Sequence, residues 1–367
     1  MIKVLQIGLG SNPGGIESCI LNYNRHIDIS KIRFEYADIY GKGIVHTDEI
    51  LQLKGKVYQL HNYKKYPFRT AKELKEILIC RNYDVVHINM LSAANLIPVK
   101  TACKYSRGAV IVHSHNSAVP SGILRIILNK LNLHTLRCMP VVKWGCGLKA
   151  GRWMWGDMFK ADNVVPNAIE VDKFIRNSET RNVLREKCNF AEDNIVIGFV
   201  GRFSEQKNVL FTVNIMYCLL KKSSKYKLLL VGDGELRGEL EKKVKDSGLV
   251  DKIYFAGIQN NVSVWYQVMD AFILPSFFEG MPVVGIEAQA AGLPCFVSDR
   301  VSDEIDLTGS LEFLPIDKGG KVWADAIDGK LRKSHWEKVA LPKEYQIQYA
   351  VQQLEKKYKK ITSNRMK

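Results

Sequence analysis

A chain of 367 residues, 46% of them hydrophobic, is long for a single core and has enough apolar material for two domains. The N-terminal segment 1–8 is expected to form a strand that breaks at a glycine rather than a signal peptide, and no run approaches the roughly 18 uncharged apolar residues of a membrane span. The eight cysteines show no C-x-x-C spacing, which argues against a disulfide framework and is typical of reduced, packed thiols in a cytoplasm.

The net charge of +15 is unevenly distributed along the sequence. There is no acidic residue between Asp84 and Asp157, while nine basic residues fall inside this acid-free span: Lys100, Lys104, Arg107, Arg125, Lys130, Arg137, Lys143, Lys149 and Arg152. A field of this sign attracts polyanions. The span therefore indicates a nucleic acid, an anionic membrane surface or a phosphorylated acceptor as a partner.

The first predicted strand, residues 3–7, is followed by a glycine-rich loop over residues 8–15 and by a helix that starts near Ile16. Such a loop lets the backbone approach a phosphate closely. Its G-x-G start is also typical of dinucleotide-binding sites, but the third glycine comes one place late and the candidate acidic residue, Asp38, is late too. A tight turn without a ligand is the alternative for this loop.

Residues 84–89 and 109–116 are two predicted buried strands, and each ends in polar side chains. Ligands bind at such strand ends in open parallel sheets. His113 and His115 are two residues apart and therefore share one face of the second strand. Zinc is not expected, because no further Cys or carboxylate with ligand spacing accompanies them. The alternative is that both are structural histidines with internal hydrogen bonds.

Residues 123–133 are strongly apolar with interspersed cations and predict a helix. A basic amphipathic helix can lie on a membrane surface, whereas most apolar helices pack inward. Both interpretations stay open, and the acid-free surroundings favour the membrane.

The second half of the chain starts with a predicted buried strand at 195–200 and a loop that carries Arg202 and, near the start of a helix, Lys207. Two cations and a helix terminus can together neutralise a leaving diphosphate. A solvated charged loop is the alternative. Two more predicted strands follow, at 227–231 and 253–257, and the second ends at a Gly257-Ile258-Gln259 turn.

The most informative stretch is 275–294, between predicted strands at 268–274 and 295–297. Gly280 is expected to supply a sharp turn, Pro282 to take the first helical position, and Gly292 to end the helix. The free backbone N–H groups of residues 281–284 would then point out of the carboxyl edge of a parallel sheet, where an anionic ligand is favoured.

Glu279 precedes the predicted start of this helix, and Glu287 lies on its second turn. Carboxylates beside a phosphate-binding helix end are not suited to holding the phosphate itself. They are suited to accepting hydrogen bonds from hydroxyl groups, and one carboxylate can take both hydroxyls of a vicinal diol such as ribose. The alternative is an ordinary loop and helix with two solvated acids.

The whole block, E-G-M-P followed by E-A-Q-A-A-G-L-P, resembles the E-x7-E signature of the retaining glycosyltransferases of family 4, which have the two-domain GT-B architecture. The segment 164–174 also resembles the family's interdomain hinge, although Ala168 and Glu170 depart from its common P-N-G-I-D pattern. The resemblance covers nearly the whole chain, and its specific motifs lie mainly in residues 195–294.

The resemblance implies roles for particular residues. Glu279 would touch the donor sugar, Glu287 would hold the nucleotide ribose, and Arg202 with Lys207 would bind the pyrophosphate. A histidine at the end of the strand 109–116 would lie against the donor sugar; we favour His113 and keep His115 as the second possibility. The remaining nucleotide-sugar-binding residues implied are Gly14, Gly15, Gly257, Ile258, Gly280, Met281, Pro282 and Val283.

We therefore predict an α/β protein with two doubly wound Rossmann-like domains that face a cleft. The acceptor-side domain spans residues 1–168 and is completed by a C-terminal helix, 345–362, that crosses back to it; the nucleotide-sugar domain spans residues 169–344. The expected enzyme is a metal-independent retaining hexosyltransferase without a cofactor, because Arg202 and Lys207 replace the metal and the chain contains no Asp-x-Asp motif.

The family's bacterial polysaccharide members extend lipid-diphosphate-linked glycans. The resemblance thus implies a nucleotide sugar, preferably a UDP-sugar, as donor, a lipid-linked saccharide as acceptor in capsule or exopolysaccharide synthesis, and peripheral association with the cytoplasmic face of the membrane. A soluble acceptor is the alternative within the family. An NAD(P)-dependent oxidoreductase built on the loop 8–15 and a nucleic-acid-binding protein are alternatives of other classes, and neither explains Glu279, Glu287, Arg202 and Lys207.

Overall fold

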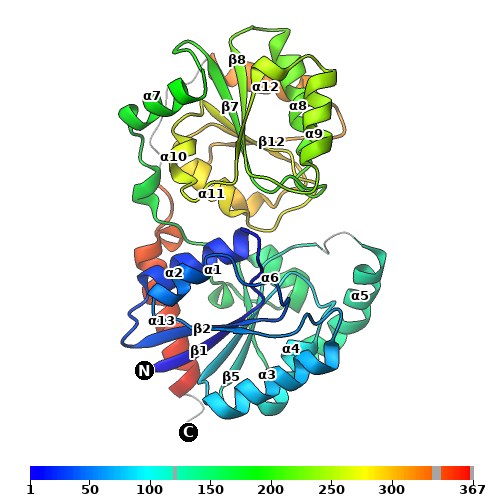
Figure 1. Cartoon of the computed structure of the whole chain (residues 1–367), viewed down its shortest axis with the longest axis vertical. Helices are drawn as coiled ribbons and strands as arrows, with labels where there is room; N and C mark the ends of the chain where they lie inside the picture. The colour runs from blue at the N-terminus through cyan, green and yellow to red at the C-terminus, as the bar shows by residue number, and fades with distance from the viewer. Residues whose placement is uncertain (119–121, 333–339, 364–367) are drawn as a thin grey trace. The chain divides into compact units, whose positions relative to one another are not determined.

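The computed structural model describes residues 1–118, 122–332 and 340–363 (Figure 1). The chain splits into two compact units, of which unit 1 comprises Met1–Ile169 with Lys343–Lys367 and unit 2 comprises Glu170–Pro342. These borders lie within two residues of those placed from the sequence.

Among the described residues, unit 1 contains a six-stranded parallel sheet with the strand order β3-β2-β1-β4-β5-β6. Its strands are β1 (Ile2–Ile7), β2 (Ile32–Asp38), β3 (Val57–Gln59), β4 (Val85–Met90), β5 (Ala109–Ser114) and β6 (Val142–Gly145). Its helices are α1 (Gly15–His26), α2 (Thr47–Gln52), α3 (Pro67–Arg81), α4 (Ile97–Tyr105), α5 (Ile123–Cys138), α6 (Leu148–Trp155), α13 (Ile347–Ser363) and the short 3-10 turns η1 (Ala161–Asn163) and η5 (Lys343–Tyr345).

Both faces of this sheet are covered, as the near-continuous apolar strands require. Successive strand residues point to opposite faces, so Val4 packs in one core cluster with α1 and α13, while Leu5 packs in a second cluster with α3 and α4. Figure 1 shows the same layers, with α1 and α13 on one face and α3 and α4 on the other.

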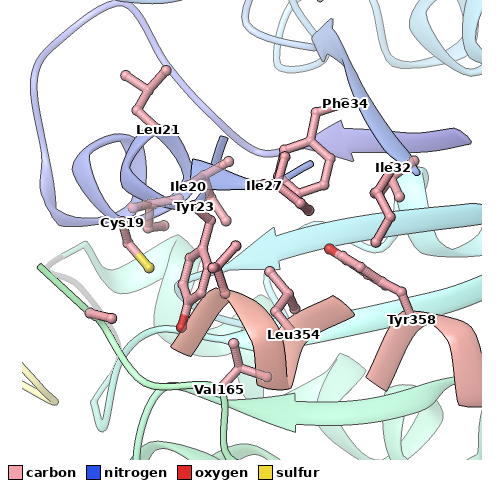
Figure 2. Close-up of a cluster of buried hydrophobic side chains, with 14 of the residues drawn as sticks. Cys19, Ile20, Leu21, Tyr23, Ile27, Ile32, Phe34, Val165, Leu354 and Tyr358 are labelled. Atoms are coloured by element: carbon pink, nitrogen blue, oxygen red, sulfur yellow. The ribbon is translucent and has the colours of Figure 1, made fainter. Parts of the chain in front are cut away.

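The C-terminal helix α13 is part of the core of unit 1. Leu354 and Tyr358 on α13 are buried beside Tyr23 of α1 and Phe34 of β2, and Figure 2 shows these side chains meeting in one cluster. Ile347 at the start of α13 donates its backbone N–H to the carbonyl oxygen of Ile169 over 3.0 Å. The expected return of the C-terminal helix to the first domain is therefore confirmed.

Unit 2 repeats the architecture with a second parallel sheet, in the order β12-β11-β10-β7-β8-β9. The strands are β7 (Ile195–Val200), β8 (Tyr226–Val231), β9 (Ile253–Gly257), β10 (Ala271–Leu274), β11 (Cys295–Ser298) and β12 (Leu311–Leu314). The helices are α7 (Ser178–Lys187), α8 (Leu210–Leu220), α9 (Arg237–Asp246), α10 (Ser263–Tyr266), α11 (Val283–Ala290), α12 (Gly320–Leu331) and the 3-10 turns η2 (Val171–Phe174), η3 (Val250–Lys252) and η4 (Asp303–Ile305).

The helices α8, α9 and α12 cover one face of the second sheet and enclose a core with Ile197 of β7 and Leu228 of β8 (Figure 1). At Gly198, whose side faces away from that core, an added Cβ would lie 2.0 Å from the sulfur of Met269. Met269 therefore packs directly against the backbone of β7 on the second face, where no side chain would fit.

Two expectations about local structure need correction. The strand before the E-G-M-P block starts at Ala271 rather than at residue 268, because Val268 and Met269 follow the short helix α10. Pro282 has extended backbone angles, φ −67° and ψ 120°, and precedes the helix instead of starting it. The chain does bend at Gly280, and Gly292, with φ 70°, does end the helix as predicted.

None of the helices in the part of the chain that the structure describes is long and apolar enough to cross a membrane.

Candidate functional site

Two of the predicted residues meet at the carboxyl edge of the second sheet. Lys207 lies in the loop after β7, Glu279 lies in the loop after β10, and these two strands are neighbours. The Nζ atom of Lys207 is 2.7 Å from Oε1 of Glu279, and the two side chains are only 17% and 11% exposed. This is a shielded ion pair at the place where ligands bind in open parallel sheets.

Hydrogen bonds to backbone groups hold the Glu279 loop on two sides. Phe277 donates its N–H to the carbonyl of Gln206 over 2.9 Å, and the Gln206 side chain donates to the carbonyl of Phe278 over 3.1 Å. On the other side, Ser302 donates its N–H to the carbonyl of Glu279 over 3.3 Å. The Glu279 carboxylate therefore projects from a loop that its neighbours fix, which suits a binding group.

Arg202 pairs with a carboxylate that the sequence analysis did not single out. Its Nε atom is 2.9 Å from Oε2 of Glu235 in the turn after β8, and both side chains are about half exposed, at 53% and 52%. An ion pair this exposed contributes about 1 kcal/mol or less, so Arg202 can exchange it for an anionic ligand at little cost. The Lys207 side chain passes close to the backbone of Gly201, where an added Cβ would be 3.5 Å from the Lys207 Cε.

Glu287 on α11 has a hydrogen-bond donor of its own. The hydroxyl of Tyr266 donates to Oε2 of Glu287 over 2.8 Å, and this fixes the orientation of the carboxyl. Burial raises the pKa of Glu287 from 4.5 to about 7, and the hydrogen bond from Tyr266 opposes the shift. The carboxyl is thus poised between its neutral and charged forms near pH 7.

The start of α11 faces the same sheet edge. Pro282 has no N–H, so the predicted set of donors at 281–284 is smaller by one. The N–H groups of Val283 and Val284 have no acceptor among the described residues, which is usual for the first turn of a helix. Glu279, Gly280, Met281, Pro282, Val283 and Glu287 therefore form one continuous loop-to-helix unit.

Gly257 and Ile258 lie at the end of β9, at the outer side of the same carboxyl edge. Gly257 has φ 69°, which favours glycine, and its carbonyl accepts the N–H of Gly232 over 2.8 Å. The Ile258 side chain is exposed.

In unit 1 the glycine-rich loop 8–15 contacts a carboxylate of α1, the helix that follows it. Gly14 precedes α1 and Gly15 is its first residue. Gly10 donates its N–H to Oε1 of Glu17 over 2.8 Å, and an added Cβ on Gly14 would lie 2.6 Å from Oε2 of Glu17. Because the partly buried carboxylate of Glu17 takes the N–H of Gly10 and lies against Gly14, the loop does not offer the anion cradle that a dinucleotide pyrophosphate needs.

Three histidines stack at the carboxyl ends of β4 and β5. His113 is fully buried, and its Nδ1 atom is 3.2 Å from Nε2 of His87, which the sequence analysis did not single out. The Nδ1 atom of His87 in turn lies 2.7 Å from the hydroxyl of Tyr358 on α13. The ring of His115 lies 4.0 Å from that of His113, and its side chain remains partly exposed.

This arrangement separates the two candidate histidines. A side chain without exposed surface cannot touch a ligand, so our preference for His113 does not fit its position, and His115 becomes the candidate. Burial is the main cause that lowers the pKa of His115 to about 3 and that of His113 well below its usual value. Both imidazoles are therefore neutral near pH 7.

Hydrogen bonds also fix the tautomer of His115. The Nδ2 group of Asn89 donates to Oε1 of Gln6 and to the carbonyl of Ile7, so Oδ1 of Asn89 is the acceptor. The Nε2 atom of His115 is 2.9 Å from that Oδ1 and must carry the proton. Since the ring is neutral, its Nδ1 atom is left as an acceptor for a hydroxyl group.

A pocket of about 160 Å³ lies at the carboxyl ends of β1 and β4 in unit 1. Its lining includes Asn89, the phenol rings of Tyr40 and Tyr63, and the cations Lys64 and Arg125. Neither of these two cations has an ion-pair partner among the described residues. The pocket therefore combines aromatic surface, amide groups and uncompensated positive charge.

No set of three or more His, Cys, Asp or Glu side chains within the described residues could hold a metal ion.

Comparison with known proteins shows what this chain is similar to. Residues 194–329 match the family model of the group 1 glycosyl transferases. The putative glycosyltransferase EpsF of Bacillus subtilis is 27% identical over 338 residues, which are 89% of this chain and 86% of EpsF. The UDP-Gal:alpha-D-GlcNAc-diphosphoundecaprenol alpha-1,3-galactosyltransferase of Escherichia coli is 30% identical over 140 residues, 37% of this chain and 36% of that protein.

The fold has close counterparts among solved structures. The Anabaena protein HepE, in complex with UDP and glucose, superposes with a TM-score of 0.71 at 16% identity, over 99% of this chain and 98% of HepE. A sucrose-phosphate synthase of Thermosynechococcus elongatus superposes with a TM-score of 0.77 at 15% identity, over 99% and 100% of the two chains. The two units thus have the GT-B fold, and the matches together support a group 1 glycosyltransferase.

The raised pKa of Glu287 predicts how the free energy of unfolding depends on pH. Between about pH 4.5 and 7 the unfolded chain loses the Glu287 proton while the folded protein keeps it, so stability falls as pH rises, by up to about 1.4 kcal/mol per pH unit. In Glu287→Gln this contribution disappears. Urea unfolding at pH 5, 6, 7 and 8 should show that the free energy of unfolding of the variant rises relative to that of the wild type up to pH 7. Above pH 7 this difference should stay constant.

The matched control is Glu312→Gln, because Glu312 is an exposed carboxylate of the same unit. Its stability profile should run parallel to that of the wild type. If the stability profile of Glu287→Gln ran parallel to that of the wild type, the raised pKa of the buried Glu287 carboxyl would be contradicted.

Proposed function

We propose that this group 1 glycosyltransferase is a retaining enzyme of family 4 that moves a sugar from a nucleotide-diphosphate sugar, preferably a UDP-sugar, to a hydroxyl of a lipid-linked glycan in cell-surface polysaccharide synthesis. The observation that carries the proposal is the shielded Lys207–Glu279 pair beside the start of α11, with Glu287 one turn further. This set offers a cation for a phosphate and carboxylates for hydroxyl groups at one sheet edge.

The donor diphosphate is assigned to Lys207, Arg202 and the first N–H groups of α11. Without a ligand, Glu279 balances the charge of Lys207 and Glu235 balances that of Arg202. A bound diphosphate replaces these carboxylates as the counter-charge. Glu279 is then available to accept hydrogen bonds from the sugar hydroxyls. Lys207 thus binds the diphosphate of the donor, and Glu279 binds its sugar.

The nucleoside is assigned to Glu287 and to the end of β9. A charged Glu287 carboxylate can accept both ribose hydroxyls while Tyr266 holds it in place from the other side. The backbone of Gly257 and Ile258 is the proposed contact for the base. A UDP-sugar is preferred because the Escherichia coli relative is named for UDP-Gal and HepE was solved with UDP and glucose.

Residues of unit 1 are assigned to the donor sugar by the family resemblance. These are Gly14, Gly15 and His115, whose unprotonated Nδ1 atom can accept a sugar hydroxyl. The buried ring of His113 packs against the ring of His115 and is not assigned a contact with the ligand.

The reaction breaks the bond between the anomeric carbon and the diphosphate oxygen, and the diphosphate keeps the electron pair. Lys207, Arg202 and the helix N–H groups stabilise the charge that develops there. The acceptor hydroxyl forms the new bond from the face that the diphosphate leaves, which retains the configuration, and its proton passes to the leaving phosphate. No metal takes part in this scheme, because the two cations supply the positive charge.

The acceptor is assigned to the pocket of unit 1. Its unpaired Arg125 and Lys64 suit the diphosphate of a lipid-linked saccharide, and the rings of Tyr40 and Tyr63 suit a sugar face. The Escherichia coli relative is named for a diphosphoundecaprenol-linked acceptor. With the acid-free span, this supports peripheral association with the cytoplasmic face of the membrane.

The charge-neutralising role of Lys207 predicts the outcome of an assay with UDP-sugars and a lipid-diphosphate saccharide. Activity should survive EDTA, while Lys207→Ala should lower turnover by about a hundred- to a thousandfold and the more exposed Arg202→Ala by about tenfold or more. As a control, Lys222→Ala removes a cation paired with Asp325 elsewhere in unit 2 and should change turnover less than twofold. Loss of activity with EDTA and its recovery with magnesium or manganese would contradict the scheme.

The position of His115 predicts a second result. His115→Ala should lower kcat by about ten- to a hundredfold and leave the affinity for UDP unchanged, because the imidazole is assigned to the sugar and not to the nucleotide. The control is His26→Ala on α1, whose imidazole contacts the carbonyl of Asn22 and no proposed ligand. If His115→Ala kept the turnover of the wild type, the assignment of His115 to the donor sugar would be wrong.

A further inference from the structure

The side of helix α5 that faces the rest of unit 1 carries polar as well as apolar residues. Asn129 and Leu136 are its buried residues, and Leu133 packs against the same core cluster as Leu136. The Oδ1 atom of Asn129 accepts the N–H of Ala93 over 2.8 Å, and the Nδ2 group of Asn132 donates to the carbonyl of Ala93 over 3.0 Å. Arg125 lines the pocket. The helix is thus attached to the unit by amide hydrogen bonds as well as by apolar contacts.

The opposite side of α5 exposes large apolar side chains. Ile123, Leu124 and Leu131 are 80%, 70% and 68% exposed. Ile126, Ile127 and Leu128 are exposed as well. We call these six residues the outer face of α5. Of the two interpretations left open for this helix, inward packing holds for Leu133 and Leu136, whereas these six apolar residues are exposed.

Single exposed apolar residues are normal on protein surfaces, but six within nine consecutive residues of one helix are not. Ile123, Ile127 and Leu131 are spaced by four residues and so form one continuous row along the helix. Water is a poor solvent for such a row, and the helix cannot rotate inward without breaking the hydrogen bonds of Asn129 and Asn132 and exposing Leu136. The outer face therefore needs an apolar partner.

We propose that the outer face of α5 inserts into the headgroup and acyl boundary of an anionic bilayer, with the helix axis parallel to the membrane plane. The sixteen residues of α5 span about 24 Å, enough to lie along the surface. Lys130 is exposed among the apolar residues, and no acidic residue occurs on α5 or anywhere between Asp84 and Asp157. This combination complements anionic headgroups above an apolar layer.

A second copy of the chain is a poorer partner for the outer face. Two α5 helices packed on each other would bring Lys130 and its neighbouring cations together without any carboxylate on either helix to compensate them. An anionic lipid surface satisfies both the charge and the apolar area.

Insertion has a consequence for the proposed acceptor site. Arg125 lies on the polar side of the helix whose outer face would enter the lipid, and Arg125 lines the pocket. The helix would hold this pocket at the membrane surface, where the diphosphate of a lipid-linked saccharide is found. This last step rests on the proposed function, whereas the membrane binding itself does not.

The experiment is vesicle co-sedimentation of the full chain with phosphatidylcholine vesicles that contain or lack 30% phosphatidylglycerol, at 0.1 and 0.5 M salt. Wild-type protein should bind the anionic vesicles and keep much of its binding at high salt, because burial of apolar side chains is not screened. The double variant Ile127→Ser with Leu131→Ser should bind at least tenfold more weakly. Phe68→Ser is the matched control, since Phe68 is 90% exposed on α3 of the same unit, and it should bind like the wild type.

Several outcomes would overturn the inference. Equal binding of the double variant and the wild type would show that cations alone attract the membrane, and no binding to either vesicle would exclude the membrane as the partner. A wild-type dimer that the double variant loses would assign the outer face to a second copy. UDP binding, measured in parallel, should stay unchanged in the double variant, so a failure of this inference is distinct from a failure of the proposed function.

Discussion

The shielded ion pair between Lys207 and Glu279 is the interaction on which the candidate site depends. A lysine and a glutamate that are both largely withdrawn from water are stable only together, because either charge left alone there would be costly. The pair therefore fixes the loop after β7 against the loop after β10. It also keeps a cation and a carboxylate available at one sheet edge, and both can change partners when a charged ligand arrives.

A second constraint ties the C-terminal helix to the end of β5. Tyr358 on α13 contacts His87, His87 contacts His113, and the ring of His113 lies against that of His115. Burial lowers the pKa of all three histidines, and only His115, at the outer end, is partly exposed. The return of the chain to unit 1 therefore does more than add apolar contacts, because it also orders the polar group nearest the sheet edge.

Much of the fold was predictable from local signals. The apolar strands at 195–200 and 253–257, the glycine turns behind them and the helix stop at Gly292 follow from periodicity and backbone preference, and the structure has all of them. The pairing of Lys207 with Glu279 was only implied, since their proximity depends on β7 and β10 being neighbours in the sheet.

The contacts that the sequence did not reveal join residues far apart in the chain. Glu235 reaches Arg202, Tyr266 reaches Glu287 and Tyr358 reaches His87, and no spacing rule connects them. Alternation places His113 and His115 on one face but cannot tell which is covered, because that depends on Trp144 and α13. Which side of α5 is exposed was hidden for a similar reason: Asn129 on the inner side is held by its hydrogen bond to Ala93, not by hydrophobicity.

The most direct test of the account is a crystal structure of the full chain with UDP bound. The account predicts the diphosphate within hydrogen-bond distance of Lys207 and Arg202, both ribose hydroxyls on the Glu287 carboxylate, and the base beside Gly257 and Ile258. A nucleotide bound instead at the loop of Gly14 and Gly15, or one at the second sheet with its ribose away from Glu287, would contradict the assignment of the site.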